Sequence, residues 1–294
     1  IVAAWGEPER LIYPRSAIKP LQALPLIESG AADRFGITDE ELALAVASHS
    51  GEARHVAAVG AWLKRLALSE ADLACGSHWP FHDDSARALA ARREAPTALH
   101  NNCSGKHTGM LATARHRGEP LAGYERPDHP VQRRAVAALA DLAQCDLARA
   151  PVATDGCGIP TLAMPLAALA RAGARFSRPD RLEPERASAC RRIAAAMAAH
   201  PYMVAGSQRL CTQVIAAAKG RVLVKTGAEG VYMAMVPALG LGLALKALDG
   251  AKRAAEVAVL ARLDGLGAVD DELRQAMAAL ASPPVLSRRG IIAG

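Results

Sequence analysis

The chain has 294 residues, of which 51% are hydrophobic and 22% charged, a composition typical of a globular protein with a large core. No apolar run approaches the roughly 18 residues of a membrane-spanning helix, so we expect no membrane partner. The net charge of +6 is spread along the chain, and only 3% of residues are aromatic. Nucleic-acid binding, which uses clustered cations and stacking aromatics, is therefore not expected. Such a charge suits attraction of a small anionic or zwitterionic substrate.

The six cysteines are too sparse for a disulfide scaffold in a chain of this length. Cys145, Cys190 and Cys211 lie in helical surroundings and are expected to be free thiols. A reducing, cytoplasmic location fits this usage best. The chain begins at Ile1 inside an apolar run that has the character of a strand, so we expect a further segment to precede it.

The first quarter of the chain predicts strands followed by helices. Short apolar runs at 1–5 and 11–13, separated by a turn, are typical of edge strands. Pro20 lacks an N–H and is tolerated only in the first turn of a helix. We therefore expect a helix to begin near Ser16, a favoured N-cap residue. A helical region then extends over 38–68 and starts with the spacing of a capping box.

The middle of the chain is helical, and strands return after residue 220. Helices are predicted at 130–142, 165–172 (ended by Gly173), 184–199 and 208–219. Strands at 221–225, 231–236 and 241–248 then precede a helix at 251–263. Because strands occur at both ends, we expect an α+β protein. One sheet would be built from residues 1–15 and 220–294, beside a mainly helical portion, 16–219, with an active site at the junction.

The stretch from Asn101 to Met110 concentrates amide, thiol, hydroxyl, amine and imidazole groups just before a predicted helix. Free N–H groups and the helix dipole favour anionic groups at such a position. Cys103 could act as a nucleophile with His107 as its base, or Cys103 could be a metal ligand. The residues alone leave both interpretations open.

Ser16 and Lys19 lie three residues apart at a helix start, where a hydroxyl beside an amine can form a nucleophile with its base. A lone Ser-x-x-Lys more often combines a helix cap with a surface lysine. However, only seven of the 35 basic residues are lysines, and Lys19, Lys106 and Lys225 each have Ser, Thr or Gly neighbours. Because lysine can lose its proton in a buried or cationic environment and arginine cannot, this usage indicates chemistry.

Two further polar turns could border the same site. Ser48 and His49 lie where one predicted helix ends and the next begins, although a simple helix-to-helix turn with a capping serine would also explain them. Residues 155–161 place the Asp155 carboxylate and the Cys157 thiol on a tight, glycine-rich turn. Each of these signals is weak when taken alone.

The combination is more specific than its parts. Ser16-x-x-Lys19 opening a helix, together with Lys225-Thr226-Gly227 on a late strand, resembles the serine β-lactamases and penicillin-binding proteins. Their Ser-Asp-Asn or Tyr-x-Asn triplet is absent. The chain instead resembles, over nearly its whole length, the Rhizobium-type L-asparaginases of the asparaginase II family. This resemblance rests on residues 13–20, 47–52, 101–110, 155–161 and 225–227.

The resemblance implies a serine-β-lactamase-like fold, a homodimer, and hydrolysis of L-asparagine to L-aspartate and ammonia. It implies two Ser–Lys pairs, Ser16 with Lys19 and Ser48 with Lys225. It also implies a metal site, usually zinc, at Cys103, Lys106 and Cys157. Given the resemblance, we favour the interpretation that Cys103 belongs to a metal site that positions the substrate. The alternative, in which Cys103 is the nucleophile, is less favoured.

A mechanism follows from the chemistry of these residues. Lys19 would accept the proton of Ser16, whose oxygen attacks the side-chain amide of asparagine to give an acyl-enzyme. A lysine acts as a base near neutral pH only when burial and neighbouring cations lower its pKa. The guanidinium fork of Arg15 suits the substrate α-carboxylate, and Asp155 could pair with the α-ammonium group. The remaining substrate-binding candidates are His107, His49 and Asn102.

Two other functions stay open at the level of sequence. The chain could be a serine acyl-enzyme hydrolase acting on β-lactams or peptides. It could also be a non-catalytic zinc-binding homologue. Ammonia release from asparagine, with metal content measured on the same sample, would discriminate among the three.

Overall fold

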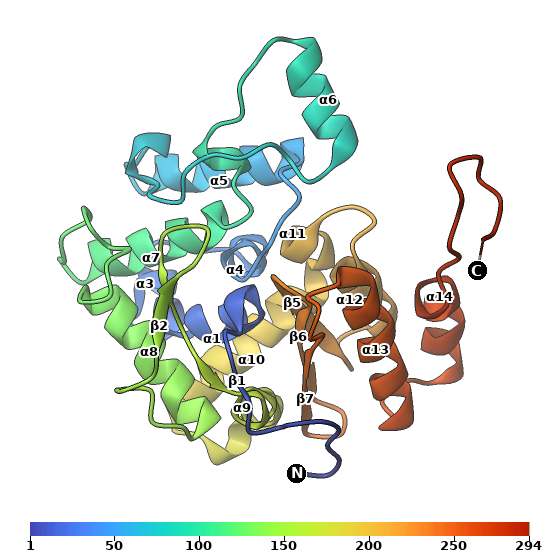
Figure 1. The fold of residues 1–294 in the computed structure, drawn as a ribbon. Helices are drawn as coiled ribbons and strands as arrows, with labels where there is room; N and C mark the ends of the chain where they lie inside the picture. Colours follow the sequence, from blue (N-terminus) through green and yellow to red (C-terminus); the bar gives the residue numbers. More distant parts are fainter. Residues whose placement is uncertain (294) are drawn as a thin grey trace.

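The computed structural model describes residues 1–293 and combines helices with short antiparallel sheets, an α+β organisation (Figure 1). The α-helices are α1 (Lys19–Gln22), α2 (Leu24–Glu28), α3 (Ala31–Arg34), α4 (Asp39–Ala45), α5 (Ala53–Arg65), α6 (Asp83–Ala91), α7 (Ser104–His116), α8 (Pro130–Ala143), α9 (Leu166–Ser177), α10 (Pro184–Ala199), α11 (Pro201–Ala205), α12 (Leu210–Ala218), α13 (Lys252–Gly265) and α14 (Asp271–Ala281). The 3₁₀ helices are η1 (Arg15–Ile18), η2 (Glu70–Asp72), η3 (Ala98–His100) and η4 (Pro179–Arg181). The strands are β1 (Leu11–Ile12), β2 (Val152–Thr154), β3 (Pro160–Leu162), β4 (Met164–Pro165), β5 (Leu223–Gly227), β6 (Val231–Val236) and β7 (Leu241–Lys246). None of the helices within residues 1–293 combines the length and apolar character that crossing a bilayer would require.

The strands β5, β6 and β7 form an antiparallel sheet in this order, with Lys225 opposite Met233 and Val231 opposite Lys246. Figure 1 shows α9 on one side of this sheet and α12 and α13 on the other. Every residue of β6 is buried, because the central strand is covered on both faces. Such a strand is expected to be a continuous apolar run, and the sequence 231–236 predicted it with the correct bounds.

The expectation of one sheet built from both chain ends is wrong. Within residues 1–293, β1 pairs with β4, which places Leu11 opposite Pro165, and neither strand joins β5–β7. Residues 1–5 form no strand; they line an apolar cavity of about 450 Å³ together with β7. An apolar pattern records which residues favour burial, but it does not specify which strand edge they bond to. The division into residues 1–15 with 220–294 and residues 16–219 stays a prediction.

The helix predicted near Ser16 begins differently from the expectation. Arg15–Ile18 is a 3₁₀ turn preceded by Pro14, so Ser16 lies inside it and is not its N-cap. The α-helical part starts at Lys19, with Pro20 in the first turn as predicted. The capping box that opens α4 is confirmed: Thr38 Oγ1 accepts from Glu41 N, and Glu41 Oε2 accepts from Thr38 N.

Gly173 does not end a helix, because α9 continues through it to Ser177. A Cβ atom at Gly173 would lie 2.9 Å from the carbonyl oxygen of Ala234 in β6. Gly242 in β7 faces the same helix, and a Cβ there would lie 2.1 Å from Ala174 N. These glycines therefore allow close packing of α9 on the sheet. In the sequence alone, a glycine required for packing cannot be distinguished from a glycine that ends a helix.

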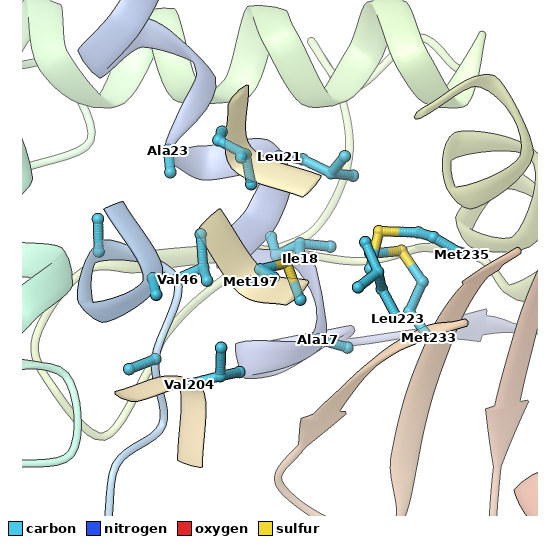
Figure 2. Packing of buried hydrophobic residues seen from close by; sticks show 14 of the residues in the cluster. Ala17, Ile18, Leu21, Ala23, Val46, Met197, Val204, Leu223, Met233 and Met235 are labelled. Carbon is cyan, nitrogen blue, oxygen red and sulfur yellow. The ribbon is translucent and has the colours of Figure 1, made fainter. Parts of the chain in front are cut away.

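The segment that follows Ser16 lies inside the hydrophobic core (Figure 2). Ala17, Ile18 and Leu21 are at most 2% exposed. Around them lie buried side chains from distant parts of the chain, among them Val46, Met197, Val204, Leu223 and Met233. Because core side chains are close-packed, this burial restrains the backbone that carries Ser16 and Lys19.

We expect Gly242→Ala to destabilise the protein by about 1–3 kcal/mol, the usual effect of overpacking a close contact. The added methyl group would clash with the backbone of α9, with Ala170 O only 2.2 Å away. Chemical denaturation followed by circular dichroism measures the free energy of unfolding. Gly265→Ala is the matched control, since nothing lies within 4 Å of its Cβ position and its φ is not positive. Equal stability of the two variants would contradict this account of the packing.

Candidate active site

Ser48 lies between two buried lysines that come from opposite ends of the chain. Its Oγ is 3.1 Å from Lys19 Nζ and 2.7 Å from Lys225 Nζ. The exposed fractions are 0% for Lys19, 4% for Ser48 and 1% for Lys225. The main-chain N–H of Ser48 donates to Val204 O at 3.0 Å, which fixes the loop after α4 against α11. Two amines therefore share one hydroxyl in a site with little access to water.

The two lysines have different environments. Lys19 Nζ also donates to Ala47 O at 2.5 Å and to Cys103 Sγ at 3.1 Å, so it has three acceptors, the number of N–H bonds in an ammonium group. The pKa of Lys225 is well below its ordinary value, first because the side chain is buried and then because the charge of Lys19 is close. Lys225 thus has the character of a neutral amine, which can accept a proton.

Ser16 lies in η1, half-buried, one turn before Lys19. Within residues 1–293, the three hydrogen bonds of Lys19 go to Ala47, Ser48 and Cys103, and none goes to Ser16. The expected pairing of Ser16 with Lys19 therefore stays a prediction. The expected contact between Ser48 and Lys225 is present, and the structure adds Lys19 to it.

Cys103 and Cys157 bring two sulfur atoms to the same buried place. Cys103 precedes α7, Cys157 lies on the turn between β2 and β3, and Lys106 Nζ donates to Cys157 Sγ at 3.0 Å. The pKa of Cys103 is well below its ordinary value because Cys157 hydrogen-bonds to it; burial opposes this effect, and the charges of Lys106 and Lys19 add to it. The cluster therefore contains a Cys103 thiolate beside the side chains of Lys19 and Lys106.

The residues Cys103, Lys106 and Cys157 fit a soft divalent metal such as zinc, because both sulfurs and the amine converge and thiolates are preferred ligands. Residues 1–293 contain no group of three or more His, Cys, Asp or Glu side chains placed to hold a metal, so Lys106 would have to be the third ligand. Burial lowers the pKa of Lys106, but the charges of Cys103 and Cys157 outweigh it and raise the pKa. Binding of a metal would therefore release a proton from Lys106.

Arg15, directly before Ser16, pairs with two carboxylates. Its Nε donates to Asp155 Oδ1 at 2.7 Å, and its Nη1 donates to Glu229 Oε1. Burial raises the pKa of Asp155, but the charge of Lys106 and the hydrogen bond from Arg15 outweigh it and keep the pKa low. Arg15 has a φ of +50°, an unusual conformation for a residue other than glycine and one that is often found at functional sites.

Sequence reasoning missed Glu229. A signal was available, because Glu229 follows Lys225-Thr226-Gly227 on a turn that the spacing predicted between two strands. The pattern could not show that this exposed carboxylate reaches Arg15, which is 214 residues away in the chain.

His49 and Asn102 line the other side of the cluster. Gly51 N donates to His49 Nδ1 at 3.1 Å, so the proton of the ring lies on Nε2, which is 2.9 Å from Ser104 Oγ. The pKa of His49 is well below its ordinary value because the ring is buried and the charges of His55, which stacks on it, and Lys19 are close. Asn102 Oδ1 lies 3.5 Å from Cys103 Sγ. His49 is thus a neutral ring that fixes the loop of Ser48.

His107 is fully buried in α7, and its Nδ1 is 2.6 Å from the hydroxyl of Tyr124. That hydroxyl also accepts from Ala74 N at 2.9 Å. The other ring nitrogen, Nε2, has no hydrogen-bond partner within residues 1–293. The pKa of His107 is well below its ordinary value because of burial and the nearby charge of Lys106. His107 is therefore hydrogen-bonded to Tyr124, whereas Cys103 is hydrogen-bonded to Lys19 and to the Cys157 thiol.

We expect Lys225→Met to change how stability depends on pH. Because the folded-state pKa of Lys225 lies below its unfolded value of about 10.4, the unfolded chain binds more protons, and the free energy of unfolding of the wild type rises with pH across this interval. The variant lacks this contribution, so its stability relative to the wild type should be highest at low pH and fall toward pH about 10. Each unit of pKa shift corresponds to about 1.4 kcal/mol.

Urea denaturation at several pH values measures this difference. Lys64→Met is the matched control, since Lys64 is exposed on α5. A difference between Lys225→Met and the wild type that does not change with pH would contradict a neutral Lys225.

Comparison with known proteins adds the family. No curated protein matches the chain. The family model described as L-asparaginase II matches residues 1–294, the full length of the sequence. This match covers Ser48, both lysines and the thiol cluster alike. The chain therefore belongs to the L-asparaginase II family.

Proposed function

We propose that this protein hydrolyses L-asparagine to L-aspartate and ammonia through an acyl-enzyme formed on a serine. The family supports an amidohydrolase acting on a small molecule. The observation that carries the mechanism is the buried row Lys19–Ser48–Lys225, in which one hydroxyl contacts two amines and one amine has a lowered pKa. Burying two amines around one hydroxyl costs desolvation energy in a hydrophobic core, and such groups with a shifted pKa are typical of sites of proton transfer.

Ser16 is the nucleophile in this proposal. It is more exposed than Ser48, so a substrate can reach its oxygen, and Lys19 lies one turn further along the same segment. When the Ser16 oxygen attacks the amide carbon, its proton passes to Lys225 through Lys19 and Ser48. A proton then passes from Lys225 back through Ser48 and Lys19 to the leaving nitrogen, and ammonia departs as the C–N bond breaks. Water then attacks the ester, gives a proton to the same groups, and releases L-aspartate and the free Ser16 hydroxyl.

The substrate is held by groups next to Ser16. Arg15 binds the α-carboxylate with its planar fork, and Asp155 binds the α-ammonium group. The N–H groups at the start of η1 would donate to the developing oxyanion. His49 and Asn102 form the side of the site opposite these residues, and His107 in α7 stabilises that side.

Zinc is proposed at Cys103, Lys106 and Cys157. The metal would supply a positive charge that polarises a bound substrate oxygen. Cys103 also accepts from Lys19, so the metal site and the row of amines share one residue. This connection supports a positioning role for the cluster.

Further features are proposed on the strength of the family resemblance. They are, in order, a serine-β-lactamase-like arrangement, a homodimer and a cytoplasmic location. In the serine-β-lactamase-like arrangement, η1 and β5 bring Ser16 and Lys225 to one site. The close approach of β5 to η1 supports the first, because a Cβ atom at Gly227 would lie 2.6 Å from Pro14 O and 3.2 Å from Ala17 N. The free cysteines support the last.

We expect Ser16→Ala to abolish acyl-enzyme formation and to lower kcat with asparagine by about 10³-fold or more, because no other hydroxyl replaces the nucleophile. Ser48→Ala should lower kcat by about 10²–10⁴-fold, the contribution of general acid–base catalysis. Coupled assay of ammonia and mass spectrometry of the quenched enzyme measure both effects. Ser69→Ala, at an exposed serine, is the control. Full activity of Ser16→Ala would contradict the assignment of the nucleophile, and turnover of nitrocefin would favour a β-lactamase.

We expect kcat/KM for asparagine to fall as the pH decreases through the lowered pKa of Lys225, because protonation removes the base. Lys225→Arg should be inactive over the whole pH range, since arginine stays protonated. A pH–rate profile measured with wild-type enzyme tests the first statement. Activity of Lys225→Arg comparable to that of the wild type would refute the relay.

A further inference from the structure

Glu229 is an exposed carboxylate that contacts Arg15, the residue directly before Ser16. Its Oε1 accepts from Arg15 Nη1, while Asp155 occupies the Nε side of the same guanidinium group. The side chain of Asp155 is 12% exposed and that of Glu229 is 66% exposed. Arg15 therefore forms ion pairs with two carboxylates: that of Asp155, which is mostly buried, and that of Glu229, which solvent or a bound molecule can reach.

The position of Glu229 is set by the turn between β5 and β6. Gly227 allows the end of β5 to approach η1, where any Cβ atom would lie 2.6 Å from Pro14 O. Two residues later, Glu229 adopts a φ of +61°, a conformation that favours glycine. Lys246 Nζ holds the backbone at this point by donating to Glu229 O at 2.9 Å. The turn keeps a strained residue beside Arg15, as is common at functional sites.

The carboxylate itself is held only loosely. Within residues 1–293, Arg15 is the single hydrogen-bond donor to the Glu229 side chain, and an exposed ion pair of this kind contributes little to stability. Asp155, by contrast, also accepts from Gly156 N at 2.9 Å. A ligand can thus displace Glu229 from Arg15 with little cost and leave Asp155 in place.

The charges around Arg15 match a zwitterion. Arg15 carries one positive charge and faces two carboxylates, and the charge of Lys106 also acts on Asp155, so the excess negative charge lies on the Glu229 side. An α-amino acid that places its carboxylate on Arg15 also brings an ammonium group, which this excess attracts. In asparagine, the α-carbon is two bonds from the amide carbon, so its charged groups must lie close to Ser16 during attack.

We infer that Glu229 is a specificity-determining residue that binds the α-ammonium group of the substrate together with Asp155, after the substrate carboxylate has taken its place on Arg15. This assignment rests on the proposed function and extends it. Glu229 then selects α-amino acid amides over amides that have a carboxylate but no amine. It also occupies Arg15 when no substrate is bound.

Binding of the product L-aspartate and of succinate, which lacks only the amine, tests this assignment without catalysis. Isothermal titration calorimetry of the purified full chain gives the ratio of the two dissociation constants. We expect the wild type to prefer L-aspartate, and Glu229→Gln to reduce this preference about tenfold, the effect of losing one charge-assisted hydrogen bond. Glu272→Gln is the matched control, because that glutamate is 67% exposed and pairs with Lys219 on α12's C-terminal side.

Two results would overturn the inference: no preference for L-aspartate in the wild type, and an unchanged preference in Glu229→Gln. If both ligands bind Glu229→Gln more tightly in equal measure, the preference is unchanged, and Glu229 is only a competitor for Arg15. Ammonia release from asparagine is measured separately on the same preparations. A protein that shows the expected change in preference but releases no ammonia would contradict the proposed hydrolysis and leave the role of Glu229 intact.

Discussion

The structure depends on the burial of two lysines beside a single serine hydroxyl. Lys19 and Lys225 both contact Ser48, and neither is more than 1% exposed. Two full positive charges at this distance inside a protein would be strongly unfavourable, so one amine is neutral. Lys225, whose pKa is lowered, takes that role. The position of the proton in the cluster is therefore determined by burial and by the second cation.

The neighbouring groups follow from the same constraint. Cys103 accepts from Lys19, and the negative charge of its thiolate balances the positive charge that Lys19 brings into the core. Lys106 contacts Cys157 on the far side, so sulfur and amine groups alternate through the cluster. Such an alternation offsets part of the cost of desolvation, and it provides a neutral amine at Lys225 that can accept a proton and a thiolate at Cys103 that can bind a metal.

The hydrophobic core and the cluster are joined through η1 and β5. Ala17 and Ile18 are buried immediately after Ser16, and Val224 is buried immediately before Lys225. The two segments touch because Gly227 leaves room for Pro14. Residues from the beginning and the end of the chain are thus held together by packing, and the turn that carries Glu229 is placed beside Arg15 by the same contact.

Local sequence determined most of the helices, the strand β6 and the capping box of α4, because these depend on neighbouring residues and on apolar periodicity. The resemblance to a family implied the pairing of Ser48 with Lys225, and these two side chains are in contact. Only the tertiary structure decided that β1 pairs with β4, that Gly173 is a packing residue, that Lys19 contacts Ser48, and that Glu229 reaches Arg15. Each of these is a contact between segments far apart in the chain, and local propensity carries no information about which distant surfaces meet.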